Sequence, residues 1–172
     1  MFTNPLELTR QSSAAFTGTV VDVAPGRSIV SEGQWYRTRD NWVVVQVRVD
    51  QTISDSYDAA DDGSVYVSMR RGVNAIDQAG EVIPDDPNPS VVDVKKALTG
   101  IRVLVMANPD DVNVLLDGPN TSLERGPTEI PAGATLLDGV HPQRMVFDEG
   151  NERLEDWPEY TFDGLVAAAS KG

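Results

Sequence analysis

Two segments in which apolar and polar residues alternate constrain the fold more than any other feature. From Val43 to Val49 every second residue is valine, and residues 64–71 repeat the pattern. A period of two is typical of a β-strand with one buried face. The side chains expected to face a core are Val43, Val45, Val47, Val49, Ile53, Val65, Val67 and Met69. The sequence therefore predicts two half-buried strands, at 42–53 and 64–71.

The rest of the chain predicts further short strands and a few small helices. Strands are expected at 16–24, 101–106, 112–116, 134–137 and 144–147, and helices at 4–14, 91–98 and 161–170. Residues 27–40 are expected to form a connection or an irregular hairpin. Residues 54–63, 72–90 and 117–133 are expected to be loops or long connections.

Many short strands with only small helices predict an all-β domain. The number of strands fits an OB-like (oligonucleotide/oligosaccharide-binding) small β-barrel with short peripheral helices. A β-sandwich of the immunoglobulin type is the alternative, which the long connections disfavour. The length of 172 residues predicts a single β-barrel domain over residues 1–172.

The charge of the chain restricts its partners. There are 27 acidic and 14 basic residues, giving a net charge of −13. The negative charge opposes binding to phosphate backbones, so no nucleic acid is expected as a partner. It suits a basic partner, or it serves solubility alone. No apolar run reaches the length of a transmembrane segment, and residues 1–10 lack the pattern of a signal peptide.

Catalytic and metal-binding patterns are absent from the sequence. The chain has no cysteine, and its one histidine, His141, is expected in a solvated turn because no nucleophile elbow or zinc motif is present. Asp55, Asp58, Asp61 and Asp62 share one loop, but their spacing misses the EF-hand pattern. A solvated turn is expected there, with calcium binding as the alternative. No metal or cofactor is therefore predicted.

The order of the segments resembles a family of poorly characterised OB-like domains in exported or lipid-anchored proteins of high-GC Gram-positive bacteria. The resemblance is carried by residues 18–26, 42–53, 63–67, 98–105, 142–147 and 161–165. Arg144 departs from it, since the family tends to place glycine after Pro-Gln. The resemblance implies the fold and a location outside the cytoplasm or in the cell envelope, whereas a chain without a leader would be cytoplasmic. It implies no activity.

The outward face of the two alternating strands is the predicted binding surface. It carries Trp42, Arg48, Tyr66 and Arg70, with Val44 beside them. OB barrels commonly bind ligands in this region, and aromatic and arginine side chains can stack on them. The alternative is that a terminal helix or the connection 72–90 covers Trp42 and Tyr66. The sequence thus predicts a non-catalytic binding or accessory domain for another protein, with a carboxylate-dependent hydrolase as the alternative.

Overall fold

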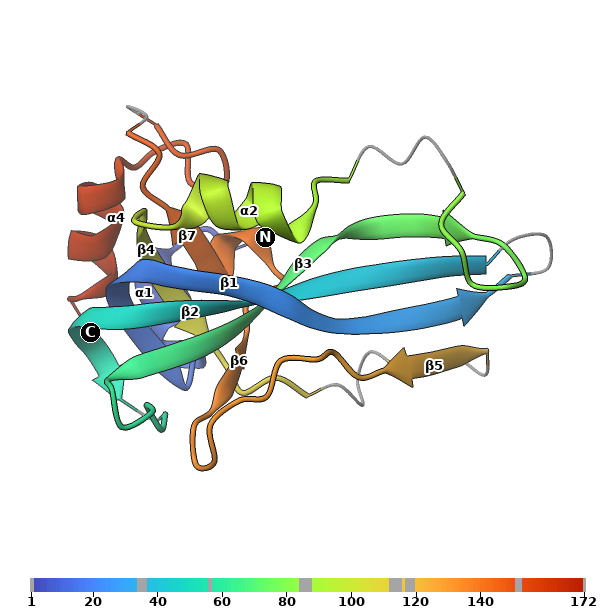
Figure 1. The fold of residues 1–172 in the computed structure, drawn as a ribbon. Coiled ribbons are helices and arrows are strands. Elements are labelled where there is room, and N and C mark those ends of the chain that lie inside the picture. Colours follow the sequence, from blue (N-terminus) through green and yellow to red (C-terminus); the bar gives the residue numbers. More distant parts are fainter. Residues whose placement is uncertain are drawn as a thin grey trace.

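The computed structural model describes residues 2–33, 37–55, 57–83, 88–111, 116, 120–150 and 153–171. These residues form strands and short helices (Figure 1). The strands are β1 (Ala14–Glu32), β2 (Arg37–Asp55), β3 (Ser64–Ile76), β4 (Arg102–Ala107), β5 (Thr121–Glu124), β6 (Leu136–Asp138) and β7 (Met145–Phe147). The helices are α1 (Pro5–Gln11), α2 (Val91–Leu98), α4 (Phe162–Ala169) and the 3-10 helix η1 (Pro142–Arg144).

The strands form one mixed sheet in the order β6-β3-β2-β1-β4-β7, and β5 pairs with β1. All pairs are antiparallel except β3–β6, which is parallel. The expectation of a sheet-dominated fold with short helices is confirmed. Within the part of the chain that the structure describes, no pairing of the two end strands, β6 and β7, closes the sheet. A backbone bridge between Pro109 and Leu137 nevertheless places β6 beside the residues that follow β4.

The longest elements are β1 and β2, each of 19 residues. They pair from Ala14 opposite Asp55 to Glu32 opposite Arg37. Of the two alternatives for residues 27–40, the described part is a hairpin. With the far ends of β3 and β5 it forms an arm that projects from the helical end of the molecule (Figure 1).

The sequence pattern predicted shorter strands in the arm than the structure contains. Residues 72–76 continue β3, and β5 lies in a segment expected to be loop. The register shift between Pro25 and Ser28 interrupts the alternation of side chains along β1. The sequence pattern therefore did not predict one continuous strand. The predicted strand at 112–116 falls mainly on residues outside the described ones. β4 pairs instead with β1 and β7.

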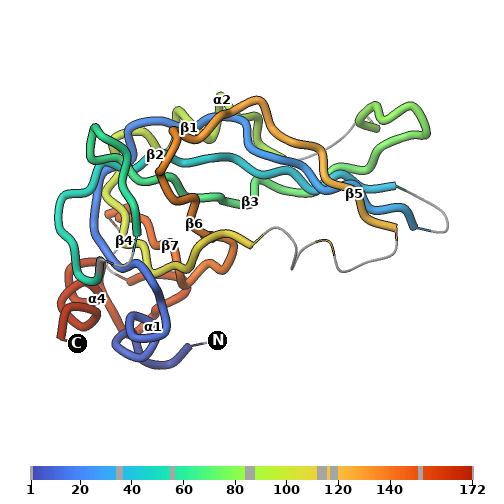
Figure 2. Tube along the Cα trace, turned by 90° about the horizontal axis from the view of Figure 1, so that it is seen from below, coloured from blue at the N-terminus to red at the C-terminus, as the bar shows by residue number. Residues whose placement is uncertain are grey.

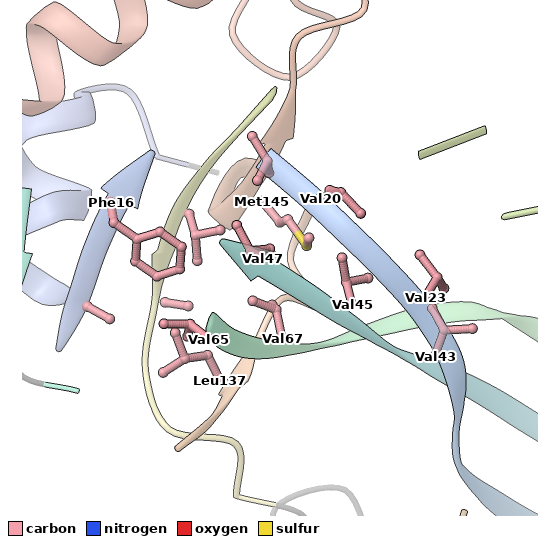
Figure 3. Packing of buried hydrophobic residues seen from close by; sticks show 14 of the residues in the cluster. Phe16, Val20, Val23, Val43, Val45, Val47, Val65, Val67, Leu137 and Met145 are labelled. Atoms are coloured by element: carbon pink, nitrogen blue, oxygen red, sulfur yellow. The ribbon is translucent and has the colours of Figure 1, made fainter. Parts of the chain in front are cut away.

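An inner cluster of apolar side chains fills the space enclosed by the sheet (Figure 3). Its buried members are Ala14, Phe16, Val20, Val23, Val43, Val45, Val47, Val65, Val67, Val94, Val103, Val105, Ala107, Leu137 and Met145. Five of the side chains expected to face the core are among them, and Val49 and Met69 pack against the cluster partly buried. The alternation in β2 and β3 therefore predicted the core correctly.

Ile53 is the exception, because it packs against a different cluster on the other face of the sheet. Register shifts in the β1–β2 pairing on both sides of Thr52 insert extra residues into β2, and each such insertion changes the face on which later side chains lie. This outer cluster consists of Leu8, Ala15, Leu104, Met106, Val146, Leu154, Trp157, Phe162, Leu165 and Ala169. In β4 the two clusters alternate residue by residue.

The helices α1, α2 and α4 begin at the capping residues that the sequence indicates. Asn4 Oδ1 accepts a hydrogen bond from the Leu6 amide, and Thr161 Oγ1 accepts one from Gly164. Ser90 and Asp93 form a capping box, and the hydroxyl and amide of Ser90 donate to the Asp93 carboxylate and lower its pKa. α1 and α4 lie at the same end of the molecule (Figure 2). Among the described residues no helix is long and apolar enough to cross a membrane.

Candidate binding groove

The predicted binding face is not an open surface. Trp42 and Val44 are buried, with 4% and 7% of their surfaces exposed. The alternative of a covered face therefore applies to Trp42, and both side chains lie on the face of β2 that points away from the inner cluster. The chain between β5 and β6 runs along this side of the sheet (Figure 2), and it contributes to a cavity with Val44 and Ser68. The wall of this cavity comes from residues 123–136, and the Arg27 guanidinium lies over the Trp42 ring.

Of the other three predicted residues, Arg70 lies directly opposite Trp42 in the β2–β3 ladder, whereas Arg48 and Tyr66 lie further along the two strands. Arg70 is half-exposed and pairs with Asp40, with Nη2 and Oδ2 separated by 2.7 Å. Arg48 is exposed and lies opposite Ser64 in the ladder. Tyr66 is half-buried and lines another cavity. The structure therefore places Trp42 and Arg70 side by side in the ladder, and Arg48 and Tyr66 at other positions of the same two strands.

The cavity above Val44 and Ser68 is a groove of about 530 Å³. Its floor is the outer face of β2 and β3, and its wall is the chain from the end of β5 to β6. Six of its lining residues are Arg27, Val44, Ser68, Leu123, Ile130 and Leu136. Four of these are apolar, and the volume lies within the range of about 300–1,000 Å³ that is common for ligand sites.

Close backbone packing holds the groove wall in place. Thr128 Oγ1 donates a hydrogen bond to the Pro25 carbonyl, with an oxygen–oxygen distance of 2.6 Å. A Cβ atom at Gly126 would lie 2.1 Å from the carbonyl oxygen of Gly26. A Cβ at Gly26 would in turn lie 3.0 Å from the carbonyl carbon of Trp42. Two glycines thus allow the wall, β1 and β2 to stack at this point.

A buried ion pair lies beside the groove, and one of its two members, Arg27, lines it. Arg27 holds Asp110 with both terminal nitrogens; the Nη2–Oδ1 distance is 2.9 Å, and Nη1 contacts Oδ2. The two side chains are only 12% and 3% exposed. The Arg27 guanidinium also lies over the Trp42 ring, 5.4 Å from its centroid. The pair connects the middle of β1 to the residues that follow β4.

Two hydrogen-bond donors in this cluster are unused. Among the described residues, neither Arg27 Nε nor Trp42 Nε1 has a hydrogen-bond partner, although both atoms are buried. Buried polar groups are nearly always satisfied in native proteins. Sequence reasoning missed Arg27, Leu123 and Ile130, because it read their segments as connection or loop. The one available signal was the placement of apolar Trp42 and Val44 on the outer face, which predicts a second covering layer.

Tyr66 lines a separate cavity of about 430 Å³ with Asp58, Asp61, Asp62 and residues 131–133. Burial, and then the negative charge of Asp62, raise the pKa of Tyr66. Within the described residues there is no group of three acidic or histidine side chains that could hold a metal ion. The side chain of Asp55 lies outside the described residues.

We expect the Asp62→Asn substitution to lower the pKa of Tyr66 toward its ordinary value, since it removes the charge and keeps an oxygen for the Ser64 amide. The raised pKa favours the neutral phenol in the folded protein. Its contribution to stability is therefore present below the ordinary pKa of about 10 and is lost as the pH rises through the folded value. NMR titration of the Tyr66 ring measures the change. An equal shift in the control Asp61→Asn would contradict the assignment to Asp62.

His141 is half-buried and caps η1, where its Nδ1 accepts a hydrogen bond from the Gln143 amide at 3.2 Å. It also contacts the ring of Phe2 edge-on. The expected turn position is thus correct, but the side chain has a structural role there and is not fully solvated. Gln143, which is 1% exposed, bonds to the main chain of Phe2 and Asp156.

Comparison of the chain with protein-family models, with curated protein sequences and with solved structures gives no match. The groove therefore has to be interpreted from its own geometry and chemistry.

Proposed function

We propose that this chain is a non-catalytic binding domain built on an OB-type barrel, and that it holds a segment of a partner protein in the groove. Four features support the barrel. The strands β1, β2 and β3 are consecutive antiparallel neighbours, β3 and β6 are parallel, and α2 lies between β3 and β4. The Asp110 amide donates to Leu136 O and the Asp138 amide to Asn108 O, each at 2.8 Å, on the side where a barrel would close.

The position of the groove is the main support for a binding function. OB domains bind through the face of their second and third strands and through the loops after the first and fourth strands. The groove lies on the outer face of β2 and β3. Its wall comes from the segment after β4, and Gly26 and Arg27 come from the β1–β2 hairpin. The same resemblance in architecture supports membership of the OB-like domains that the sequence resembles.

The charge of the molecule supports a basic protein as the partner. The net charge of −13 attracts a cationic surface and accelerates its encounter with the domain. The apolar part of the groove lining is formed by Val44, Leu123, Ile130 and Leu136, while Arg27, Arg125 and Glu129 also line it. The part of the partner that meets the four apolar side chains would be apolar. An apolar segment flanked by basic residues satisfies both conditions.

Site-specific photo-crosslinking tests this proposal. A benzophenone amino acid at position 130 should capture one partner from the native extract, whereas the same group at Val92, 75% exposed on α2, should not. The captured protein is then purified and its affinity is measured. We expect Ile130→Asp to weaken binding by at least about tenfold, because it places a charge in an apolar site.

The matched variant Val92→Asp should leave the affinity unchanged, and higher salt should weaken binding to the unmodified domain. Identical products from positions 130 and 92, or an affinity that Ile130→Asp does not change, would overturn the proposal. The alternative, a carboxylate-dependent hydrolase, predicts turnover with a bell-shaped pH dependence in a hydrolytic screen. Turnover that is lost with a single carboxylate substitution would replace binding as the main function.

A further inference from the structure

We propose that the groove and the cavity at Tyr66 form one docking surface for an extended segment of the partner protein, in which a basic residue stands two positions from an apolar one. This inference rests on the proposed function and specifies the sequence that the groove selects. The apolar side chain lies against Val44 and Leu136 in the groove, and the basic side chain lies against Tyr66 in the cavity.

The groove and the cavity meet at β3 and β6. Ser68 and Tyr66 lie on the same outer face of β3, since side chains two residues apart in a strand share a face. Ser68 lines the groove, whereas Tyr66 lines the cavity. Tyr66 also pairs with Leu136 in the parallel β3–β6 ladder, and Leu136 is a groove residue. The two hollows are therefore neighbours on one surface.

The chain segment that forms the groove wall also borders the cavity. Ile130 lines the groove, and residues 131–133, which follow it, line the cavity. The other side of the cavity is formed by residues 58–62, which are bonded to the same segment. The Thr135 amide donates to the Asp58 carbonyl at 3.0 Å, and the Asp58 amide donates to Thr135 Oγ1 at 3.2 Å. These bonds fix the cavity relative to the groove.

The two parts of this surface differ in charge. Three carboxylates line the cavity, those of Asp58, Asp61 and Asp62. Among the described residues no basic side chain lines the cavity, and none forms an ion pair with these carboxylates. The groove, in contrast, is lined by Arg27, Arg125 and Glu129 besides its apolar residues. A cationic group of the partner is therefore favoured at the cavity end.

A basic side chain fits this end by its chemistry. An ammonium or guanidinium group is attracted by nearby carboxylates and by the face of an aromatic ring. Tyr66 is only half-buried, so its side chain is partly accessible from the cavity. A bound metal ion is not supported, because the described residues hold no group of three acidic or histidine side chains that could ligate it.

The spacing of the two hollows sets the spacing in the partner. Ser68 and Tyr66 are two residues apart in an extended strand, which corresponds to about 7 Å. An extended segment that runs along β3 places its own side chains at positions i and i+2 on one side, at the same separation. The surface therefore selects an apolar and a basic residue with one residue between them.

Terminally blocked tripeptides test the inference. The probes are Leu-Ser-Lys and Lys-Ser-Leu, which cover both directions of the chain, and norleucine replaces lysine in the matched controls. We expect the better lysine probe to bind with a dissociation constant of about 1–10 mM. It should bind about fivefold more tightly than its norleucine control and than Leu-Lys-Ser, in which the two residues are adjacent. In NMR titrations of the ¹⁵N-labelled protein, the amides of both Ser68 and Tyr66 should shift.

The Asp61→Asn/Asp62→Asn double variant should reduce the preference for lysine over norleucine to within about twofold. The matched Glu7→Gln/Glu155→Gln variant removes the same charge from exposed residues outside the groove and the cavity, and it should keep the preference. Thermal melting verifies that both variants are folded. If the double variant unfolds, Asp61→Asn compared with Glu7→Gln measures the same difference.

Three outcomes would overturn the inference. The first is an equal loss of preference in both double variants, which would indicate attraction by the overall charge. The second is that the lysine probe shifts the amide of Tyr66 without that of Ser68, which would show that the two hollows do not act together. The third is that neither probe shifts either amide although the partner captured at position 130 still binds the groove. Loss of selective capture at position 130 contradicts the proposed function instead.

Discussion

Replacing Phe16 by alanine should lower the free energy of unfolding by about 3–5 kcal/mol. The ring is fully buried in the inner cluster. It lies in the first part of β1, between Thr52 of β2 and Val105 of β4. Its centroid is 5.2 Å from that of Tyr57, with the planes inclined at 45°. Alanine would leave a cavity where three strands and a loop meet, and these elements can collapse only in part.

Urea denaturation, monitored by circular dichroism, measures this loss. Phe16→Leu is the matched control, since it keeps most of the apolar volume and should cost about 1 kcal/mol. The slope of the transition should be the same for both variants. If the alanine variant loses no more stability than the leucine variant, the inner cluster is not packed around this ring.

The central part of the fold could be predicted because burial leaves a regular pattern there. Val43, Val45 and Val47 face one core, and the polar residues between them do not. The helices could be predicted because their first turns carry strong caps, such as the Ser90–Asp93 pair. The arm could not be predicted, because its strands contact solvent on much of their surface and Pro25-Gly26 resembles a turn. In the structure these residues lie at an irregularity within a continuous strand.

The candidate groove lies on the face of β2 and β3 that the alternation predicted to point outward, but Trp42, Arg48, Tyr66 and Arg70 do not line it. The alternation of side chains along β2 correctly placed Trp42 and Val44 away from the inner cluster. This alternation, however, does not indicate whether a second layer covers the outer face. That layer is the segment 123–136, whose contact with β1 depends on the glycine pair Gly26 and Gly126. Because this contact joins residues about a hundred positions apart, no local pattern in the sequence reveals it. The groove that it forms therefore appeared only in the structure.

The Asp110→Ala variant should lose about 3–5 kcal/mol of stability, because it leaves the Arg27 charge buried without a counter-ion. Both partners are largely removed from solvent, with exposures of 12% and 3%. Lys95→Ala is the control, since Lys95 pairs with Asp22 where the two side chains are 53% and 42% exposed. That pair is screened by water and should contribute less than about 1 kcal/mol. Urea denaturation at neutral pH compares the two losses.

A double variant separates the stability lost when Arg27 is left without its counter-ion from the net contribution of the intact ion pair to stability. Arg27→Met with Asp110→Leu removes both charges and fills the space with apolar atoms, and a replacement of this kind is often neutral or stabilising. We expect it to regain most of the stability that Asp110→Ala loses. If the double variant is as unstable as the single one, the ion pair itself stabilises the fold. If stability returns while binding to the groove is lost, the Arg27–Asp110 pair serves recognition and does not stabilise the fold.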